Sequence, residues 1–261
     1  MDWLQLAGKR VLLTGGAGGL GGAIAAEFLA AGAHVALIDR DEDGLARTIT
    51  DLGHGPDRLV SRTCDLGDAA AVSACVADLA RDFGAPSILI NNAAMSASQP
   101  LAELDPARME GQLRVNLVGC LAMAQAFRTA SEGLPDRAIV NVTSISGRNP
   151  QPGGGGYSTG KAALLMLNAQ LALEWGPEGI RSNAVSPGLF ITPISERFYA
   201  DPEDRRRREQ VVPLRRIGQT RELADTVLYL ASPRASYVNG EEVIVDGGFS
   251  RTLMAHVPRR Y

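Results

Sequence analysis

The sequence has few of the residues from which disulfide frameworks and metal sites are built. Its three cysteines, Cys64, Cys75 and Cys120, are far apart along 261 residues, and none belongs to a CxxC pair or to a cluster with histidine. This spacing fits neither a disulfide-stabilised secreted domain nor a zinc site. We therefore expect reduced thiols in a cytoplasmic protein, and no bound metal.

Long apolar runs and a surplus of one charge are missing as well. No run approaches the roughly 18 apolar residues of a membrane span, and the opening Met-Asp-Trp-Leu-Gln lacks the regions of a secretory signal. The 26 lysines and arginines nearly balance the 29 aspartates and glutamates, whereas proteins that bind nucleic acids usually carry a strongly basic face. We expect neither a membrane nor a nucleic acid as partner.

Short apolar segments alternate with longer, alanine-rich segments along the chain. The segments rich in Val, Ile and Leu are residues 10–14, 34–39, 87–91, 138–144 and 242–245. Residues 20–31 and 69–83 have the apolar spacing of helices. Buried strands that alternate with helices predict an α/β fold with a doubly wound parallel sheet. No linker or change of composition divides residues 1–261, so we expect a single domain that ends in a polar tail at 249–261.

A glycine-rich turn follows the first predicted strand. It reads Gly15-Gly-Ala-Gly-Gly19-Leu20-Gly21 and leads into a predicted helix. Glycines let a backbone turn tightly and approach a pyrophosphate, whose negative charge is stabilised at the N-terminus of a helix. Asp39 ends the next predicted strand about 20 residues on, where a carboxylate accepts hydrogen bonds from an adenosine ribose. Together these features predict a dinucleotide-binding site.

A tyrosine and a lysine form the second chemical signal. Tyr157 and Lys161 are four residues apart and share one face of a predicted helix. An ammonium beside a phenol lowers the pKa of the phenol from about 10, and such a tyrosine exchanges a proton with an alcohol or carbonyl near neutral pH. Ser144, at the end of a predicted strand, is placed to donate to the same substrate oxygen. Beside a dinucleotide site, these residues predict a proton relay.

These motifs, in this order, resemble those of the short-chain dehydrogenase/reductase family over residues 8–248. Other matching segments are Asp65 with Leu66, Asn91-Asn92-Ala93-Ala94, Asn116, Ser186-Pro187-Gly188 with Phe190 and Thr192, and Val245-Asp246-Gly247-Gly248. Ala94 departs from the glycine that is usual in the family. The resemblance implies a Rossmann-type sheet of seven parallel strands in the order 3-2-1-4-5-6-7, and a homotetramer.

The resemblance also implies an oxidoreductase that interconverts a secondary alcohol and a ketone. Tyr157 is then the acid and base, and Lys161 holds the nicotinamide ribose and lowers the pKa of the tyrosine. Ser144 orients the substrate oxygen, and Asn116 supports a water that leads to solvent. The implied cofactor-binding residues are Gly15, Gly19, Leu20, Gly21, Asp39, Arg40, Asp65, Leu66, Asn92, Ala93, Tyr157, Lys161, Pro187, Gly188, Phe190 and Thr192.

Asp39 and Arg40 favour different forms of the cofactor. The carboxylate of Asp39 repels the 2′-phosphate of NADP, whereas the guanidinium of Arg40 attracts it. Arg40 does not remove the carboxylate, and Gly18 stands where NADP-dependent relatives often have a basic residue. We therefore predict NAD as the cofactor, preferred by at least tenfold.

The residues expected near the substrate are mostly polar. They are Ser96, Ser146, Asn149 and Gln151, and aromatic residues make up only 5% of the chain. This favours a sugar, polyol or sugar acid over a less polar alcohol or carbonyl compound. A non-catalytic NAD-binding regulator and a nucleotide-sugar epimerase or dehydratase remain alternatives, although the intact tetrad disfavours the first and the chain length disfavours the second.

Two segments near the expected site have unusual composition. Residues 190–213 resemble the variable substrate lid of the family, and we expect 193–212 to be mobile until cofactor and substrate bind. The four consecutive glycines at 153–156 are interpreted either as mobile backbone with room for the substrate or as a tolerant surface loop.

Overall fold

The computed structural model describes residues 3–192, 195–196 and 199–258. Within these residues, seven strands form one parallel sheet in the order β3-β2-β1-β4-β5-β6-β7. The strands are β1 (Arg10–Thr14), β2 (His34–Asp39), β3 (Leu59–Thr63), β4 (Ile88–Asn91), β5 (Arg137–Val142), β6 (Ile180–Pro187) and β7 (Glu242–Val245). The predicted α/β fold and the strand order are confirmed.

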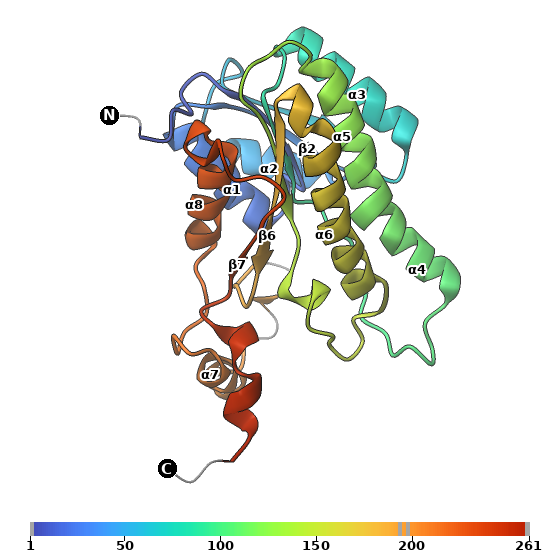
Figure 1. Cartoon of the computed structure of the whole chain (residues 1–261), viewed down its shortest axis with the longest axis vertical. Coiled ribbons are helices and arrows are strands. Elements are labelled where there is room, and N and C mark those ends of the chain that lie inside the picture. The colour runs from blue at the N-terminus through green and yellow to red at the C-terminus, as the bar shows by residue number, and fades with distance from the viewer. Residues whose placement is uncertain (1–2, 193–194, 197–198, 259–261) are drawn as a thin grey trace.

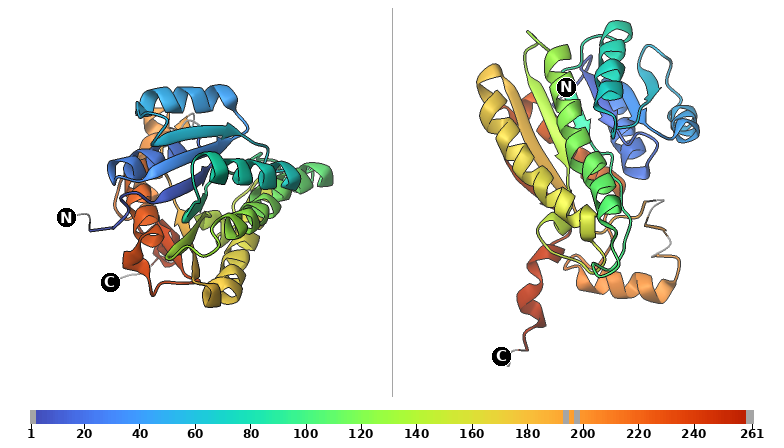
Figure 2. Two further views of the ribbon diagram at one scale, coloured as in Figure 1. Left: turned by 90° about the horizontal axis from the view of Figure 1, so that it is seen from above. Right: turned by 90° about the vertical axis from the view of Figure 1, so that its right-hand side faces the viewer.

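Helices cover both faces of the sheet (Figures 1 and 2). They are α1 (Gly19–Ala30), α2 (Glu42–Leu52), α3 (Ala69–Asp82), α4 (Pro106–Leu113), α5 (Gly119–Ala130), α6 (Gly155–Trp175), α7 (Pro202–Val211) and α8 (Thr220–Ala231). α1 packs against α8 on one face, and α3 packs against α5 on the other, with α6 beside them. None of the described helices is long and apolar enough to cross a membrane.

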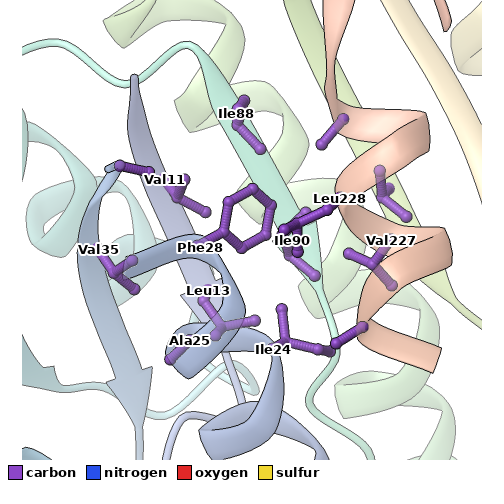
Figure 3. Packing of buried hydrophobic residues seen from close by; sticks show 14 of the residues in the cluster. Val11, Leu13, Ile24, Ala25, Phe28, Val35, Ile88, Ile90, Val227 and Leu228 are labelled. Carbon is purple, nitrogen blue, oxygen red and sulfur yellow. The ribbon is translucent and has the colours of Figure 1, made fainter. Parts of the chain in front are cut away.

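Successive residues of the central strands point into two separate hydrophobic cores. In β1, Val11 and Leu13 belong to the core under α1 and α8, whereas Leu12 belongs to the core under α3 and α5. Because side chains alternate along a strand, only a continuous apolar run buries both faces. Phe28 of α1 fills the first core and is fully buried beside Ile90 (Figure 3). This packing holds the glycine turn between β1 and α1 in place.

The bounds of the elements agree with the predicted segments except near the site. β1, β2 and β7 have the predicted ends, but β5 stops at Val142, so Ser144 lies beyond the strand and caps a short 3-10 turn. α6 begins at Gly155, so half of the four-glycine segment is helical.

The expected lid and tail contain short helical elements in their described parts. The lid includes α7, which has no buried residue, while positions 193–194 and 197–198 lie outside the described residues. The mobility of the lid therefore stays a prediction. In the tail, two 3-10 turns span Phe249–Arg251 and Leu253–His256, and 259–261 lie outside the described residues.

Candidate active site

The glycine turn between β1 and α1 is too tightly packed for side chains at two positions. Gly15 has a φ of +72°, and a Cβ added there would lie 2.7 Å from Nδ2 of Asn92. A Cβ on Gly21 would lie 2.1 Å from the carbonyl oxygen of Gly15. Both glycines are therefore required for the turn to close, and the turn places Gly19 and Leu20 at the start of α1.

The N-terminus of α1 differs from the N-termini of several other helices. α2, α3, α4 and α7 each follow an aspartate whose carboxylate accepts a hydrogen bond from backbone amides of the first turn. α1 instead follows Gly18, which has no capping side chain, and its first turn holds no acidic residue. The positive end of this helix is thus left to an external anion, and the pyrophosphate of a dinucleotide fits it.

Thr14 connects the glycine turn to the residues after β4. Its Oγ1 accepts hydrogen bonds from the backbone amides of Asn92 and Ala93 at 3.0 and 3.1 Å. The Nδ2 of Asn92 donates in turn to the carbonyl oxygens of Thr14 and Gly15. The structure thereby brings the predicted residues Asn92 and Ala93 against the turn, through the threonine that ends β1.

Asp39, at the end of β2, lies beside the same turn. Its Oδ2 accepts from the backbone amide of Ala17 at 3.1 Å, and its Oδ1 accepts from the amide of Asp41 at 3.1 Å. The carboxylate is therefore held in one orientation next to the turn, as a ribose-binding residue requires. The side chain of Arg40 is exposed.

The second acidic residue, Asp65, follows the neighbouring strand β3. Its Oδ1 accepts from the amide of Gly67 at 2.8 Å, and its side chain is exposed, whereas Leu66 is buried. The amide of Cys64 donates to the carbonyl of Asp39 at 2.8 Å. Parallel pairing of β2 with β3 thus places the two acidic residues at the carboxyl ends of adjacent strands.

Ser144, Tyr157 and Lys161 converge between β5 and the first two turns of α6. The side chain of Ser144 favours the phenolate form of Tyr157 and so lowers its pKa, and Nζ of Lys161 lies 5.9 Å from the centroid of the tyrosine ring. Lys161 is 1% exposed, and its Nζ donates to the carbonyl of Val142 at 2.7 Å. The helical spacing inferred from the sequence therefore produces the expected cluster.

The pKa values of Tyr157 and Lys161 differ from the expectation. Burial raises the pKa of Tyr157, although the hydrogen bond with Ser144 opposes this effect. Burial also lowers the pKa of Lys161 to about 8. The ammonium of Lys161 is engaged by a carbonyl and is itself destabilised by burial. The loss of solvent around the phenol therefore dominates the pKa of Tyr157.

Asn116 lies in a π-helical turn, Arg114–Val118, between α4 and α5. Its side chain is fully buried. Its Oδ1 accepts from the amide of Met95 at 2.7 Å, and its Nδ2 donates to the carbonyl of the same residue at 2.9 Å. The side chain thus fixes the segment after β4, and the expected support of a water stays a proposal.

A buried row of polar side chains anchors α6 to the sheet. Sequence reasoning identified only Asn91 among these side chains, as part of a motif that resembles the family's. Asn91 donates to Asn141 at 2.9 Å, and Asn141 donates to Asn168 of α6 at 3.0 Å. Ser182 also donates to Asn168, at 2.9 Å. Asparagines inside buried strands are the only signal in the sequence for this network, which fixes the helix that carries Tyr157 and Lys161.

The residues predicted to contact the nicotinamide follow β6. Pro187 and Gly188 are half-buried at the carboxyl end of the strand, and Thr192 is half-buried further on. The ring of Phe190 packs so closely on Gly218 that a Cβ there would lie 2.6 Å from it. Because this ring belongs to the hydrophobic core, Phe190 is left with its backbone to contact a cofactor.

The predicted substrate residues lie on two segments. Ser146 follows Ser144 in the 3-10 turn, and its amide donates to the Oγ of Ser144 at 3.1 Å. Asn149 and Gln151 are exposed in the loop that precedes α6, and Ser96 is exposed in the segment after β4. The described residues contain no group of three acidic, histidine or cysteine side chains able to hold a metal ion.

Comparisons with known proteins find relatives along nearly the whole chain. A family model described as enoyl-(acyl carrier protein) reductase matches residues 15–250. The chain is 30% identical over 246 residues to D-threitol dehydrogenase of Mycolicibacterium smegmatis, with 94% of each chain covered. It is 34% identical over 251 residues to 3beta-hydroxysteroid dehydrogenase 1 of Eggerthella lenta, with 94% of this chain and 95% of that protein covered.

A similar solved structure is that of a gluconate 5-dehydrogenase from Burkholderia cenocepacia in complex with NADP and tartrate. It has a TM-score of 0.88 and 30% identity, and the match covers 96% of this chain and 98% of that one. The fold, the site and these matches lead to one conclusion: the chain belongs to the short-chain dehydrogenase/reductase family.

Proposed function

We propose that this protein is an NAD-dependent dehydrogenase that interconverts a secondary alcohol and a ketone, with a polyol, sugar or sugar acid as substrate. The observation that carries the proposal is the convergence of Ser144, Tyr157 and Lys161 beside a glycine turn that leaves α1 uncapped. The similarity to a threitol dehydrogenase and to a gluconate dehydrogenase supports the substrate class.

The side chains of the cluster move the proton in this reaction. A bound nicotinamide cofactor supplies the hydride chemistry that side chains lack. During oxidation, the phenolate of Tyr157 takes the proton of the substrate hydroxyl, and during reduction the phenol returns it. Ser144 donates a hydrogen bond to the substrate oxygen, and the ammonium of Lys161 stabilises the phenolate. A substrate that displaces water from the site strengthens each of these interactions.

A substrate screen tests this proposal. Initial rates are measured for polyols, aldoses, hydroxy acids and plain secondary alcohols, each with NAD and with NADP. We expect the highest kcat/KM for a polyhydroxy compound, because Ser146, Asn149 and Gln151 supply hydrogen-bonding groups near Ser144. No turnover of any alcohol would favour a non-catalytic NAD-binding protein instead.

A less polar substrate is the second candidate. The 34% identity to a 3beta-hydroxysteroid dehydrogenase supports it, since that relative is as similar to this chain as the polyol dehydrogenase. A hydroxysteroid belongs in the same screen, and a kcat/KM for it above those of all polyols would decide for this candidate.

We expect NAD to be preferred over NADP by at least tenfold in kcat/KM. The carboxylate of Asp39 is held beside the turn, and two like charges about 4 Å apart repel by roughly 4 kcal/mol at an effective dielectric constant of 20. Asp39→Ser should shrink the preference, by weakening NAD and relieving NADP together. A higher kcat/KM with NADP in the unmodified protein would show that the attraction by Arg40 exceeds the repulsion by Asp39. The similar gluconate 5-dehydrogenase was solved in complex with NADP.

We also propose a homotetramer in a reducing compartment such as the cytoplasm. The three cysteines are free, which supports the reducing compartment. Large apolar side chains are exposed near and along α6, namely Val118, Met166 and Leu173, and these support an interface between copies of the chain. Light scattering coupled to size exclusion should give about four times the chain mass of 27.6 kDa. A mass of one chain at micromolar concentration would contradict the tetramer.

A further inference from the structure

The four glycines before Tyr157 are contact points for other parts of the chain. A Cβ on Gly153 would lie 2.4 Å from the Oγ of Ser98, and a Cβ on Gly155 would lie 2.8 Å from a methyl of Leu104. The amide of Gln99 also donates to the carbonyl of Gly153 at 3.2 Å. At Gly153 and Gly155, the space left by the missing side chain is therefore filled by the segment between β4 and α4. Only part of the four-glycine run is loop.

Gln112 of α4 makes the contact at the last of these glycines. Its side chain is fully buried, and its Nε2 donates to the carbonyl of Ala97 at 3.0 Å. Its Oε1 has no hydrogen-bond partner and faces Gly156, where an added Cβ would lie 2.3 Å away. One side chain thus touches both the segment that carries Ser96 and the residue directly before Tyr157.

The same arrangement recurs one helical turn later. Asn116 hydrogen-bonds to both backbone groups of Met95. A Cβ added to Gly160, the residue directly before Lys161, would lie 3.2 Å from the Cβ of Asn116. Two amide side chains four residues apart therefore face two glycines four residues apart on α6, which lies alongside α4 (Figure 1). Each amide holds one neighbour of Ser96, so the position of Ser96 relative to Tyr157 depends on both.

We propose that Gln112 is a positioning residue for the substrate, acting through the Met95–Ala97 segment and Gly156. Its hydrogen bond to Ala97 fixes where Ser96 stands, and its contact with Gly156 sets the distance of the Met95–Ala97 segment from the first turn of α6. Gln112 touches neither the proton relay nor the cofactor turn. Its loss should therefore weaken substrate binding and leave the chemical step nearly intact. This inference rests on the proposed dehydrogenase function.

Gln112→Met tests the inference, because methionine keeps the length of the side chain and removes the hydrogen bond to Ala97. With the best alcohol from the screen, we expect KM for the alcohol to rise about 5- to 20-fold. The value of kcat should change less than threefold, and KM for NAD and the pH profile of kcat should stay unchanged. The matched control is Gln125→Met on α5, whose side chain is exposed, and it should change none of these values.

Gly156→Ala provides a second variant. Its added methyl would lie 2.3 Å from Oε1 of Gln112 and would therefore displace that amide. Its KM for the alcohol should rise similarly. In the double variant Gln112→Ala/Gly156→Ala, the increase should equal that of Gln112→Ala alone, because both changes remove one contact. Additive increases, or parallel losses in kcat and in KM for NAD, would overturn the assignment.

Hydrogen exchange in the free protein separates this inference from the proposed function. Gln112→Met should speed exchange at the amides of residues 95–99 and leave those of the glycine turn at 15–21 unchanged. Equal exchange at 95–99 in the variant and the unmodified protein would overturn the role of Gln112 whether or not any alcohol is oxidised. A faster exchange together with no turnover would support the contact and remove the dehydrogenase function.

Discussion

Replacing Tyr157 with phenylalanine should lower kcat by roughly 10²–10⁴-fold, the range usual for loss of a general acid or base. The change removes one oxygen and leaves the buried ring in the first turn of α6, so the affinity for NAD should change far less than kcat. Steady-state rates with the best alcohol, together with NAD titration by fluorescence, measure both quantities.

A matched control for this variant is Tyr229→Phe on α8. Tyr229 stacks on Trp3 with ring centroids 6.4 Å apart, away from the cluster of Ser144 and Lys161. The Tyr229→Phe variant loses the same phenolic oxygen and should keep a normal kcat. Near-normal turnover in Tyr157→Phe would reject the proton relay as the mechanism.

Replacing Lys161 with methionine should lower kcat by at least 100-fold and also raise KM for NAD. We assign the lysine two roles, which are to stabilise the phenolate and to hold the nicotinamide ribose. Its loss should therefore lower kcat and raise KM for NAD. Gly156→Ala and Gln112→Met, which act on substrate position, should instead leave KM for NAD unchanged. A Lys161→Met variant with altered kcat and normal KM for NAD would remove the second task.

The same substitution should leave stability equal or higher at pH 7. The pKa of Lys161 is lowered from 10.5 to about 8 in the folded chain, so the unfolded chain binds this proton more tightly. The free energy of unfolding therefore decreases as pH falls from about 10.5 to about 8, because the unfolded chain takes up the lysine proton first. The total decrease is on the order of 3 kcal/mol. Methionine removes this penalty but leaves the carbonyl of Val142 unpaired, at about 1–3 kcal/mol. A fall in melting temperature of several degrees at pH 7 would contradict this.

The parts of the fold that the sequence predicts well are those with continuous apolar strands. β1 and β2 are buried on both faces, and their Val, Ile and Leu residues stand out. β3 and β6 were not recognised from their residues and entered only through the family resemblance. β3 is exposed at its end, and β6 carries Arg181, Ser182 and Asn183. The buried polar residues of β6 are explained by hydrogen bonds to Asn168 and to backbone groups. No local sequence pattern predicts these hydrogen bonds.

The candidate site was predictable where short-range spacing determines the geometry. The four-residue spacing of Tyr157 and Lys161 and the glycine turn each produce the expected local arrangement. Contacts between distant segments were not predictable, and Gln112 is the clearest case. A glutamine in an amphipathic segment indicates an exposed face, whereas here tertiary packing buries it against Gly156. The pKa of Tyr157 was misjudged for a similar reason, because burial was not visible in the spacing.

We propose that this chain transfers a hydride from a carbinol carbon to free NAD. The direct measurement uses a polyol deuterated at its carbinol carbons and follows the mass of the nicotinamide product with time. We expect one deuterium in each NADH formed, with one ketone formed for each NADH, and a loss of both signals in Tyr157→Phe. Turnover of the polyol without deuterium in NADH, or no NADH with any alcohol, would contradict it.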